Sequence, residues 1–163
     1  MSNDRIIIRE IKPEDDLAIA CVIRMVLIEM GVPKVGTAYA DSALDHMAST
    51  YDKENAVYFV VENCGKIIGG GGIAPLENCA EAICELQKMY FLPEARGKGI
   101  GAEMIRLCLA KAKAFGYNKC YLETLPYMTA ATALYKNVGF ENLEGPMGNT
   151  GHYSCNVWMI KSL

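Results

Sequence analysis

The most informative segment of the chain is the glycine-rich run Arg96-Gly97-Lys98-Gly99-Ile100-Gly101, which follows a predicted strand and opens a predicted helix. Glycine removes the side chains that would block the backbone, so several N–H groups can converge on one anion at the positive end of the helix. Arg96 and Lys98 add positive charge. The pattern predicts a phosphate-binding loop, and its affinity must be the sum of several interactions worth about 0.3–1 kcal/mol each.

The same glycines are compatible with a second interpretation. Gly97-x-Gly99-x-x-Ala102 fits the dinucleotide fingerprint, and Glu123 follows about 20 residues later, at the next predicted strand. That fingerprint normally begins where a strand ends in an early βαβ unit, whereas residues 93–96 intervene here and much of the chain precedes them. An NAD(P)-binding oxidoreductase therefore stays open as the less favoured alternative. A P-loop is excluded, because no GxxxxGKS or GxxxxGKT sequence occurs.

The elements that must position this loop follow from the spacing of apolar residues. Strands are predicted over 5–11, 57–62, 67–76, 84–92, 119–125 and 153–160, and helices over 41–51, 100–115 and 129–138. Another helix carries an apolar stripe from Ile19 to Met30, before Gly31 ends it. Four consecutive glycines, 69–72, predict a β-bulge within a strand. The order of elements predicts a mixed-sheet α/β fold.

Composition limits the class of protein. The 163 residues suit one domain, 1–163, and a net charge of −3 argues against a broad nucleic-acid surface. No apolar run approaches the roughly 20 residues of a membrane-spanning helix, and the first residues do not resemble an export signal. Seven cysteines without a CxxC pair predict a cytoplasmic protein without a disulfide framework. His152-x-x-Cys155 is the nearest approach to a metal pair, and no metal is predicted.

Taken together, these segments resemble the GNAT superfamily of acyl-CoA-dependent N-acetyltransferases. The family motif, Arg or Gln, two residues, Gly, one residue, then Gly or Ala, is matched by residues 96–101. The resemblance extends to Ile8-Arg9-Glu10-Ile11-Lys12-Pro13-Glu14-Asp15, to the strand over 85–94 and to Ala133-Leu134-Tyr135-Lys136-Asn137-Val138-Gly139-Phe140. It implies a mostly antiparallel sheet of about six or seven strands with helices on both faces. Strands 4 and 5 would splay apart at Met89 and Leu122 to receive the pantetheine arm.

The resemblance also implies a reaction and its residues. Family members usually move an acetyl group from acetyl-CoA directly to an amine, with no covalent enzyme intermediate. Tyr135 would be the general acid at the coenzyme sulfur, and Glu85 would be the base, directly or through water, unless Glu123 serves instead. The implied cofactor-binding residues are Met89, Tyr90, Phe91, Leu92, Arg96, Gly97, Lys98, Gly99, Ile100, Gly101, Ala102, Thr124 and Ala131.

One position departs from the family pattern. Many relatives carry an asparagine seven residues before the tyrosine, and this chain has Met128 there, which puts that coenzyme contact in doubt. The polar segment 146–155 could line an acceptor pocket, with His152 or Cys155 facing the amine, or could be a plain turn with a buried cysteine. A covalent cysteine route would need a positive or helix-end environment.

The acceptor is predicted to be a small-molecule amine, with a peptide amine also open, and no nucleic-acid or membrane partner is expected. The oligomeric state is open, although many relatives form homodimers through their C-terminal strands. A third hypothesis is a non-catalytic acyl-CoA sensor that keeps the cofactor site without the chemistry.

Overall fold

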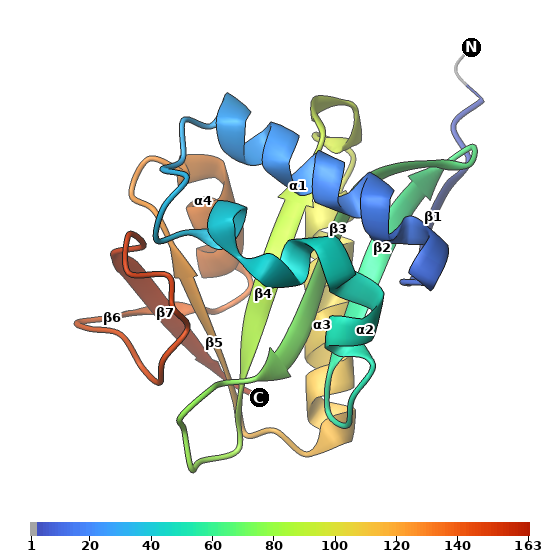
Figure 1. Cartoon of the computed structure of the whole chain (residues 1–163). Coiled ribbons are helices and arrows are strands. Elements are labelled where there is room, and N and C mark those ends of the chain that lie inside the picture. The colour runs from blue at the N-terminus through green and yellow to red at the C-terminus, as the bar shows by residue number, and fades with distance from the viewer. Residues whose placement is uncertain (1–2) are drawn as a thin grey trace.

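The computed structural model describes residues 3–163 and is built around a single sheet (Figure 1). The strands are β1 (Ile6–Glu10), β2 (Val57–Asn63), β3 (Lys66–Pro75), β4 (Ile83–Phe91), β5 (Lys119–Thr124), β6 (Glu141–Leu143) and β7 (Val157–Ser162). The helices are α1 (Asp16–Glu29), α2 (Met47–Tyr51), α3 (Ile100–Phe115) and α4 (Thr129–Asn137), with short 3-10 turns η1 (Pro13–Asp15), η2 (Ala38–Ala40), η3 (Ser42–His46) and η4 (Pro93–Ala95).

The strands lie in the order β1-β2-β3-β4-β5-β7-β6, and every neighbouring pair is antiparallel except β4 and β5. Helices α1 and α2 lie in front of the sheet in Figure 1, and α3 lies behind it. The predicted mixed α/β fold, mostly antiparallel with helices on both faces, is confirmed. Within residues 3–163 no helix is long and apolar enough to cross a membrane.

Strands β4 and β5 separate soon after they meet. They pair only at Ile83 with Lys119, Cys84 with Cys120 and Glu85 with Tyr121. Beyond Glu85, β4 continues to Phe91 beside β3, while β5 continues beside β7. The predicted gap between the strands of Met89 and Leu122 is therefore present.

The register of β3 against β4 shifts between Gly70 and Gly72, where the sequence predicts a bulge. Gly70 faces Tyr90 and Gly72 faces Gln87, so the extra residue belongs to β4 rather than to the glycine run. Lys88 has φ +50°, a left-handed conformation that is uncommon for a non-glycine residue. The Tyr58 hydroxyl donates a hydrogen bond to the Lys88 carbonyl at 2.7 Å, which holds this bulge in place.

The glycines opposite the bulge make room for the neighbouring strand. A Cβ at Gly72 would lie 2.9 Å from Tyr58 Cα and would overlap the Val57 carbonyl. We expect Gly72→Ala to lower the free energy of unfolding by about 1–3 kcal/mol, measured by urea denaturation, because backbone atoms cannot move aside cheaply. Gly145→Ala is the control, since no heavy atom lies within 4 Å of its added Cβ. Equal stability of the two variants would contradict this packing.

A half-buried ion pair joins β1 to Asp15, the N-cap residue of α1. The Arg9 guanidinium donates to both carboxylate oxygens of Asp15, at 2.8 and 2.9 Å, and to Glu62 at 2.9 Å. The Arg9 hydrogen bonds hold the pKa of Asp15 below its ordinary value. This arrangement gives a physical role to the Arg9 to Asp15 segment in which the family resemblance begins.

Two elements differ from their predicted bounds by more than one residue at an end. The helix predicted over 41–51 is a 3-10 turn, Ser42–His46, followed by the short α2. The last strand begins at Val157 rather than at 153, because the Ser154 N–H donates to the Gly36 carbonyl and the Cys155 N–H to the His152 carbonyl. Residues 153–156 therefore join the loop after α1 instead of the sheet.

Candidate active site

A cleft of about 420 Å³ lies where β4 ends and α3 begins. Its walls also include Val26 of α1, Met30 at the C-cap of α1 and Leu134 of α4, none of which was predicted as a site residue. The apolar stripe of α1 contained both Val26 and Met30, but the stripe did not distinguish core from cleft. Of the predicted cofactor-binding residues, the cleft brings together Met89, Tyr90, Phe91, Arg96, Gly97, Gly99, Ile100, Gly101, Ala102 and Ala131.

The backbone of the glycine loop is open toward the cleft at Gly97 and Gly99. Gly97 and Gly99 have φ of +72° and +77°, and no heavy atom lies within 4 Å of a Cβ added to either, so both positions stay open to a ligand. Gly99 caps α3, whose first N–H groups have no partner within the helix. The loop therefore presents the positive end of a sixteen-residue helix to the cleft.

The two cations of the loop are held by carboxylates. Arg96 donates to Glu29 at 2.8 and 3.1 Å and to the Phe91 carbonyl, which fixes the loop against α1 and β4. Lys98 lies 2.8 Å from Asp4 and faces a different hollow, beside α3 and β1. Lys98 is thus outside the main cleft, and so are two other predicted cofactor-binding residues, the buried Leu92 and Thr124.

A second, smaller cavity of about 40 Å³ occupies the gap between β4 and β5. It shares Met89, Tyr90 and Met128 with the cleft, so the two spaces adjoin. Its other walls include Tyr135, predicted as the general acid, and Thr124, predicted to bind the cofactor. They also include Glu123 and Cys155, predicted to act on or face the acceptor amine.

Tyr135 lies at this junction with its side chain almost entirely buried, and the residue is 7% exposed. Its ring packs edge-on against Phe140, with centroids 6.0 Å apart. Burial raises the pKa of Tyr135, so the hydroxyl keeps its proton at neutral pH. A neutral phenol can donate that proton to a developing thiolate.

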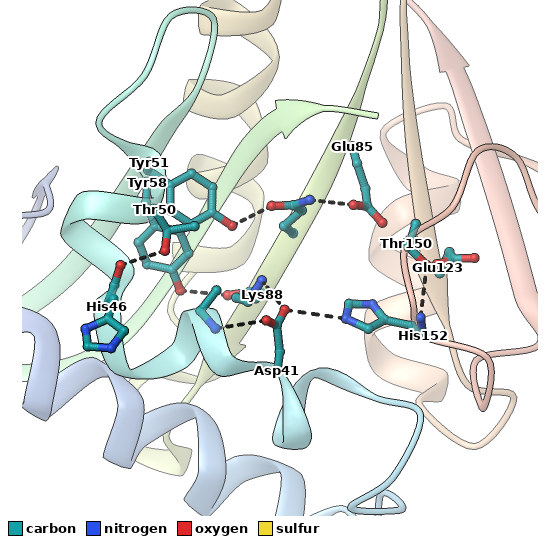
Figure 2. Close-up of polar contacts among 12 residues, drawn as sticks. Asp41, His46, Thr50, Tyr51, Tyr58, Glu85, Lys88, Glu123, Thr150 and His152 are labelled. Carbon is teal, nitrogen blue, oxygen red and sulfur yellow. Dashed lines mark hydrogen bonds and ion pairs between the residues drawn. The ribbon is translucent and has the colours of Figure 1, made fainter. Parts of the chain in front are cut away.

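Glu85 is buried at the point where β4 and β5 part, and it is 4% exposed. The Gln87 side-chain amide donates to Glu85 Oε1 at 2.5 Å, and the Tyr51 hydroxyl donates to Gln87 at 2.6 Å (Figure 2). Burial raises the pKa of Glu85 to about 7, while the Gln87 hydrogen bond opposes that shift. A carboxyl with this pKa can take up and release a proton near neutrality.

Glu123 approaches Glu85 from β5. Its Oε2 accepts from the Tyr121 hydroxyl at 2.9 Å, and its Oε1 accepts from the Thr150 hydroxyl. Glu85, Glu123 and His152 each offer one ligand atom, and these atoms lie within 4.8 Å of one another (Figure 2). The three side chains come from β4, β5 and the β6–β7 segment, and together they could hold a cation. This cluster is distinct from the His152 and Cys155 pair considered in the sequence.

Sequence analysis missed an ion-pair network beside this cluster. Lys88, whose side chain is 5% exposed, lies 3.0 Å from Asp41, and His152 Nε2 lies 3.8 Å from the same carboxylate oxygen (Figure 2). His152 and Lys88 together hold the pKa of Asp41 well below its ordinary value. The available signal was a lysine inside a largely buried strand, but its partner lies in a distant loop.

Two further side chains have environments that bear on the chemistry. Burial, with the nearby Glu123 and Glu85 charges, raises the pKa of Cys155 to about 11, which disfavours the thiolate that a covalent route would need. Met128, at the position where many relatives have asparagine, lines both cavities, and its sulfur lies 3.7 Å from the Thr124 hydroxyl. It offers a thioether rather than an amide to a ligand there.

Comparison with known proteins finds acetyltransferases by sequence and by structure. The model of a family described as Acetyltransferase (GNAT) family matches residues 29–140. An Escherichia coli (strain K12) protein described as uncharacterized N-acetyltransferase YjgM is 42% identical over 96% of this chain and 95% of its own. A GNAT-family acetyltransferase from Staphylococcus aureus Mu50 has a TM-score of 0.86 at 19% identity, covering 97% of this chain and 99% of its own. PaiA N-acetyltransferase from Thermoplasma acidophilum, solved in complex with coenzyme A, has a TM-score of 0.73 at 18% identity, covering 98% and 99%.

Proposed function

The chain belongs to the GNAT family of acetyltransferases, and on that premise we propose that it moves an acetyl group from acetyl-CoA directly to the primary amine of a small acceptor. One observation carries the proposal. The cleft at the start of α3 adjoins the cavity lined by Tyr135, and the two share Met89, Tyr90 and Met128 in their walls. A ligand with phosphates at the glycine loop would therefore reach Tyr135 with its other end.

In the proposed complex the glycine loop binds the coenzyme phosphates and the pantetheine arm follows the cleft between β4 and α4. The bulge at Lys88 and Met89 interrupts the pairing of β4 with β3. A backbone N–H released there, in the stretch from Met89 to Phe91, would point at the thioester carbonyl and stabilise the oxyanion. The cleft wall also contains Ala131, which leaves room for the arm beside α4.

In the proposed reaction Glu85 accepts a proton from the acceptor and Tyr135 donates one to the coenzyme sulfur. The protonated acceptor gives one proton to Glu85, directly or through water, and its neutral nitrogen attacks the thioester carbon. The carbon–sulfur bond then breaks, and the departing sulfur takes the proton of Tyr135; a thiol with a pKa of about 8.5 stays protonated at neutral pH. The remaining proton on nitrogen returns to the tyrosine oxygen through solvent. The products are the N-acetyl amide and coenzyme A.

The wider expectations also belong to this proposal: one domain over 1–163, a cytoplasmic location, and no nucleic-acid or membrane partner. The net charge of −3 supports the third of these, because nucleic-acid surfaces are usually basic. The binding of one acetyl-CoA per chain requires no metal. A homodimer would use the C-terminal strands.

The first test is thermal unfolding with acetyl-CoA, coenzyme A or NADH. A ligand at about 100 times its dissociation constant stabilises by roughly 2.7 kcal/mol, so acetyl-CoA and coenzyme A are expected to raise the Tm and NADH is not. Ala131→Glu places a negative charge in the cleft and should abolish the rise, whereas Ala114→Glu, on the exposed side of α3, should keep it. Stabilisation by NADH alone would contradict the proposal and favour the oxidoreductase alternative.

A further inference from the structure

We propose, building on the proposed function, that Glu85, Glu123 and His152 form a three-acceptor cage for the acceptor's ammonium group, and that the site selects amines without an adjacent carboxylate. The three ligand atoms lie within 4.8 Å of one another. Three acceptors placed about 2.9 Å from one tetrahedral nitrogen stand about 4.7 Å apart. A primary ammonium has three N–H donors in this geometry, and a secondary or tertiary one has fewer.

Each member of the cage has an acceptor available. Among residues 3–163, Glu85 Oε2 takes part in no hydrogen bond, since Gln87 donates to Oε1. Glu123 accepts one hydrogen bond at each oxygen, and each carboxylate oxygen can accept a second. His152 directs Nε2 toward Asp41, which favours the proton on Nε2 and leaves Nδ1 as an acceptor. Figure 2 shows the three side chains converging on one space.

The charges around the cage determine which amines it accepts. Lys88 is the basic residue of the smaller cavity, and its ammonium is already paired with Asp41 at 3.0 Å. A carboxylate on the carbon next to the amine would therefore meet Glu85 and Glu123 with no free cation to pair with it. Like charges placed together at a binding surface cost several kcal/mol. The cage thus favours an amine over the corresponding α-amino acid.

Glu123 also lines the smaller cavity, whose volume is about 40 Å³. This space admits an ammonium head group, so the substituents on the carbon next to the nitrogen would lie outside it. The Thr150 hydroxyl donates to Glu123 Oε1, so the β6–β7 segment contacts the cage through Thr150 and His152. The acceptor's body would extend away from the cage, toward the loop that contains Asp41.

The experiment measures kcat/KM with acetyl-CoA for phenethylamine, phenylalanine and phenylalaninamide, following release of the coenzyme thiol. Phenethylamine and phenylalaninamide are expected to exceed phenylalanine by about tenfold or more, because only phenylalanine carries the carboxylate. Equal or better use of phenylalanine would overturn the proposal. Rejection of phenylalaninamide as strongly as phenylalanine would also overturn it, since shape rather than charge would then decide.

Asp41→Asn makes the test sharper. Removing this carboxylate frees the Lys88 ammonium for an acceptor carboxylate, so the preference for phenethylamine over phenylalanine should fall to about threefold or less. The exposed Glu141→Gln is the matched control and should leave the preference unchanged. An unchanged preference in a folded Asp41→Asn protein would contradict the role given to Lys88. If that variant does not fold, the comparison of the three acceptors with the wild-type enzyme still tests the proposal.

Two outcomes distinguish failure of the ammonium cage from failure of the proposed acetyltransferase function. If no amine is acetylated although acetyl-CoA binds, the proposed transferase function fails and not only the cage. If EDTA removes activity and Zn²⁺ restores it, the three residues bind a metal ion and the ammonium cage is wrong. Activity that is indifferent to EDTA, with the expected order of acceptors, supports the cage.

Discussion

Replacing Tyr135 with phenylalanine is expected to lower kcat by about 10²–10⁴-fold, the usual contribution of a positioned general acid. The change removes one hydroxyl and keeps the ring, which packs against Phe140 with centroids 6.0 Å apart. The fold and the affinity for acetyl-CoA should therefore stay close to those of the wild type. Steady-state kinetics with saturating acetyl-CoA, together with a thermal-shift titration of coenzyme A, separates lost chemistry from lost binding.

Tyr39→Phe is the matched control for this substitution. The Tyr39 ring lies 5.2 Å below the Lys34 ammonium, a contact that the ring keeps without its hydroxyl. Turnover of Tyr39→Phe should equal that of the wild type. If Tyr135→Phe also turns over normally while both proteins bind acetyl-CoA, the coenzyme sulfur leaves without a proton from this tyrosine. Absence of turnover in all three proteins, with coenzyme binding intact, would instead favour the acyl-CoA sensor.

Replacing Glu85 with glutamine is expected to lower kcat/KM by about 10²–10⁴-fold and to remove the pH dependence of the reaction near neutrality. In the wild type the pKa of Glu85 is raised to about 7 by burial, so the carboxylate needed as a base forms only as the pH rises through that value. The wild-type kcat/KM should climb below pH 7 and level off above it. Glu123→Gln is the comparison: loss of the pH dependence there, and not in Glu85→Gln, would make Glu123 the base.

The same carboxyl links stability to pH. Because the folded pKa lies above the ordinary value of 4.5, the folded protein holds a proton that the unfolded chain releases between about pH 4.5 and 7. Stability contributed by this group is therefore present at low pH and lost as the pH rises through that window. Urea denaturation from pH 5 to 8 should show this loss in the wild type and a flatter profile in Glu85→Gln. An equal slope in both proteins would contradict the assigned pKa.

The fold could be predicted where local signals agree with tertiary packing. Helix α3 was predicted over the residues it occupies, because Gly99 and Gly116 mark its ends and both have positive φ. The last strand was predicted four residues too early, because its first residues are held by the loop after α1, through Ser154 and Gly36. A contact between segments so far apart in sequence leaves no local pattern.

The candidate site could be predicted in part for the same reason. The glycine loop and its neighbours on β4 are continuous in sequence, so most of the predicted cofactor-binding residues lie together on the wall of one cleft. The pairing of Lys88 with Asp41 joins the bulge in β4 to a loop that is distant in sequence. Lys88 is a lysine inside a largely buried strand, but nothing in the sequence indicates Asp41 as its partner. That Lys98 pairs with Asp4, outside the cleft, is likewise a matter of tertiary packing.

Strands β4 and β5 pair only from Ile83 to Glu85 and then diverge, so together they form a wedge whose apex is at this paired end. From Glu85, β4 runs about 20 Å to Phe91 at roughly 3.3 Å per residue. A rotation of about 5° at the apex therefore displaces the far end by roughly 1.7 Å, more than the length of a carbon–carbon bond. The buried Cys84 and Cys120 are paired at this apex, so a small displacement there produces a larger one at the open end. A change in side-chain volume at these two cysteines would therefore alter the opening between β4 and β5 from a position that lines neither the cleft nor the smaller cavity.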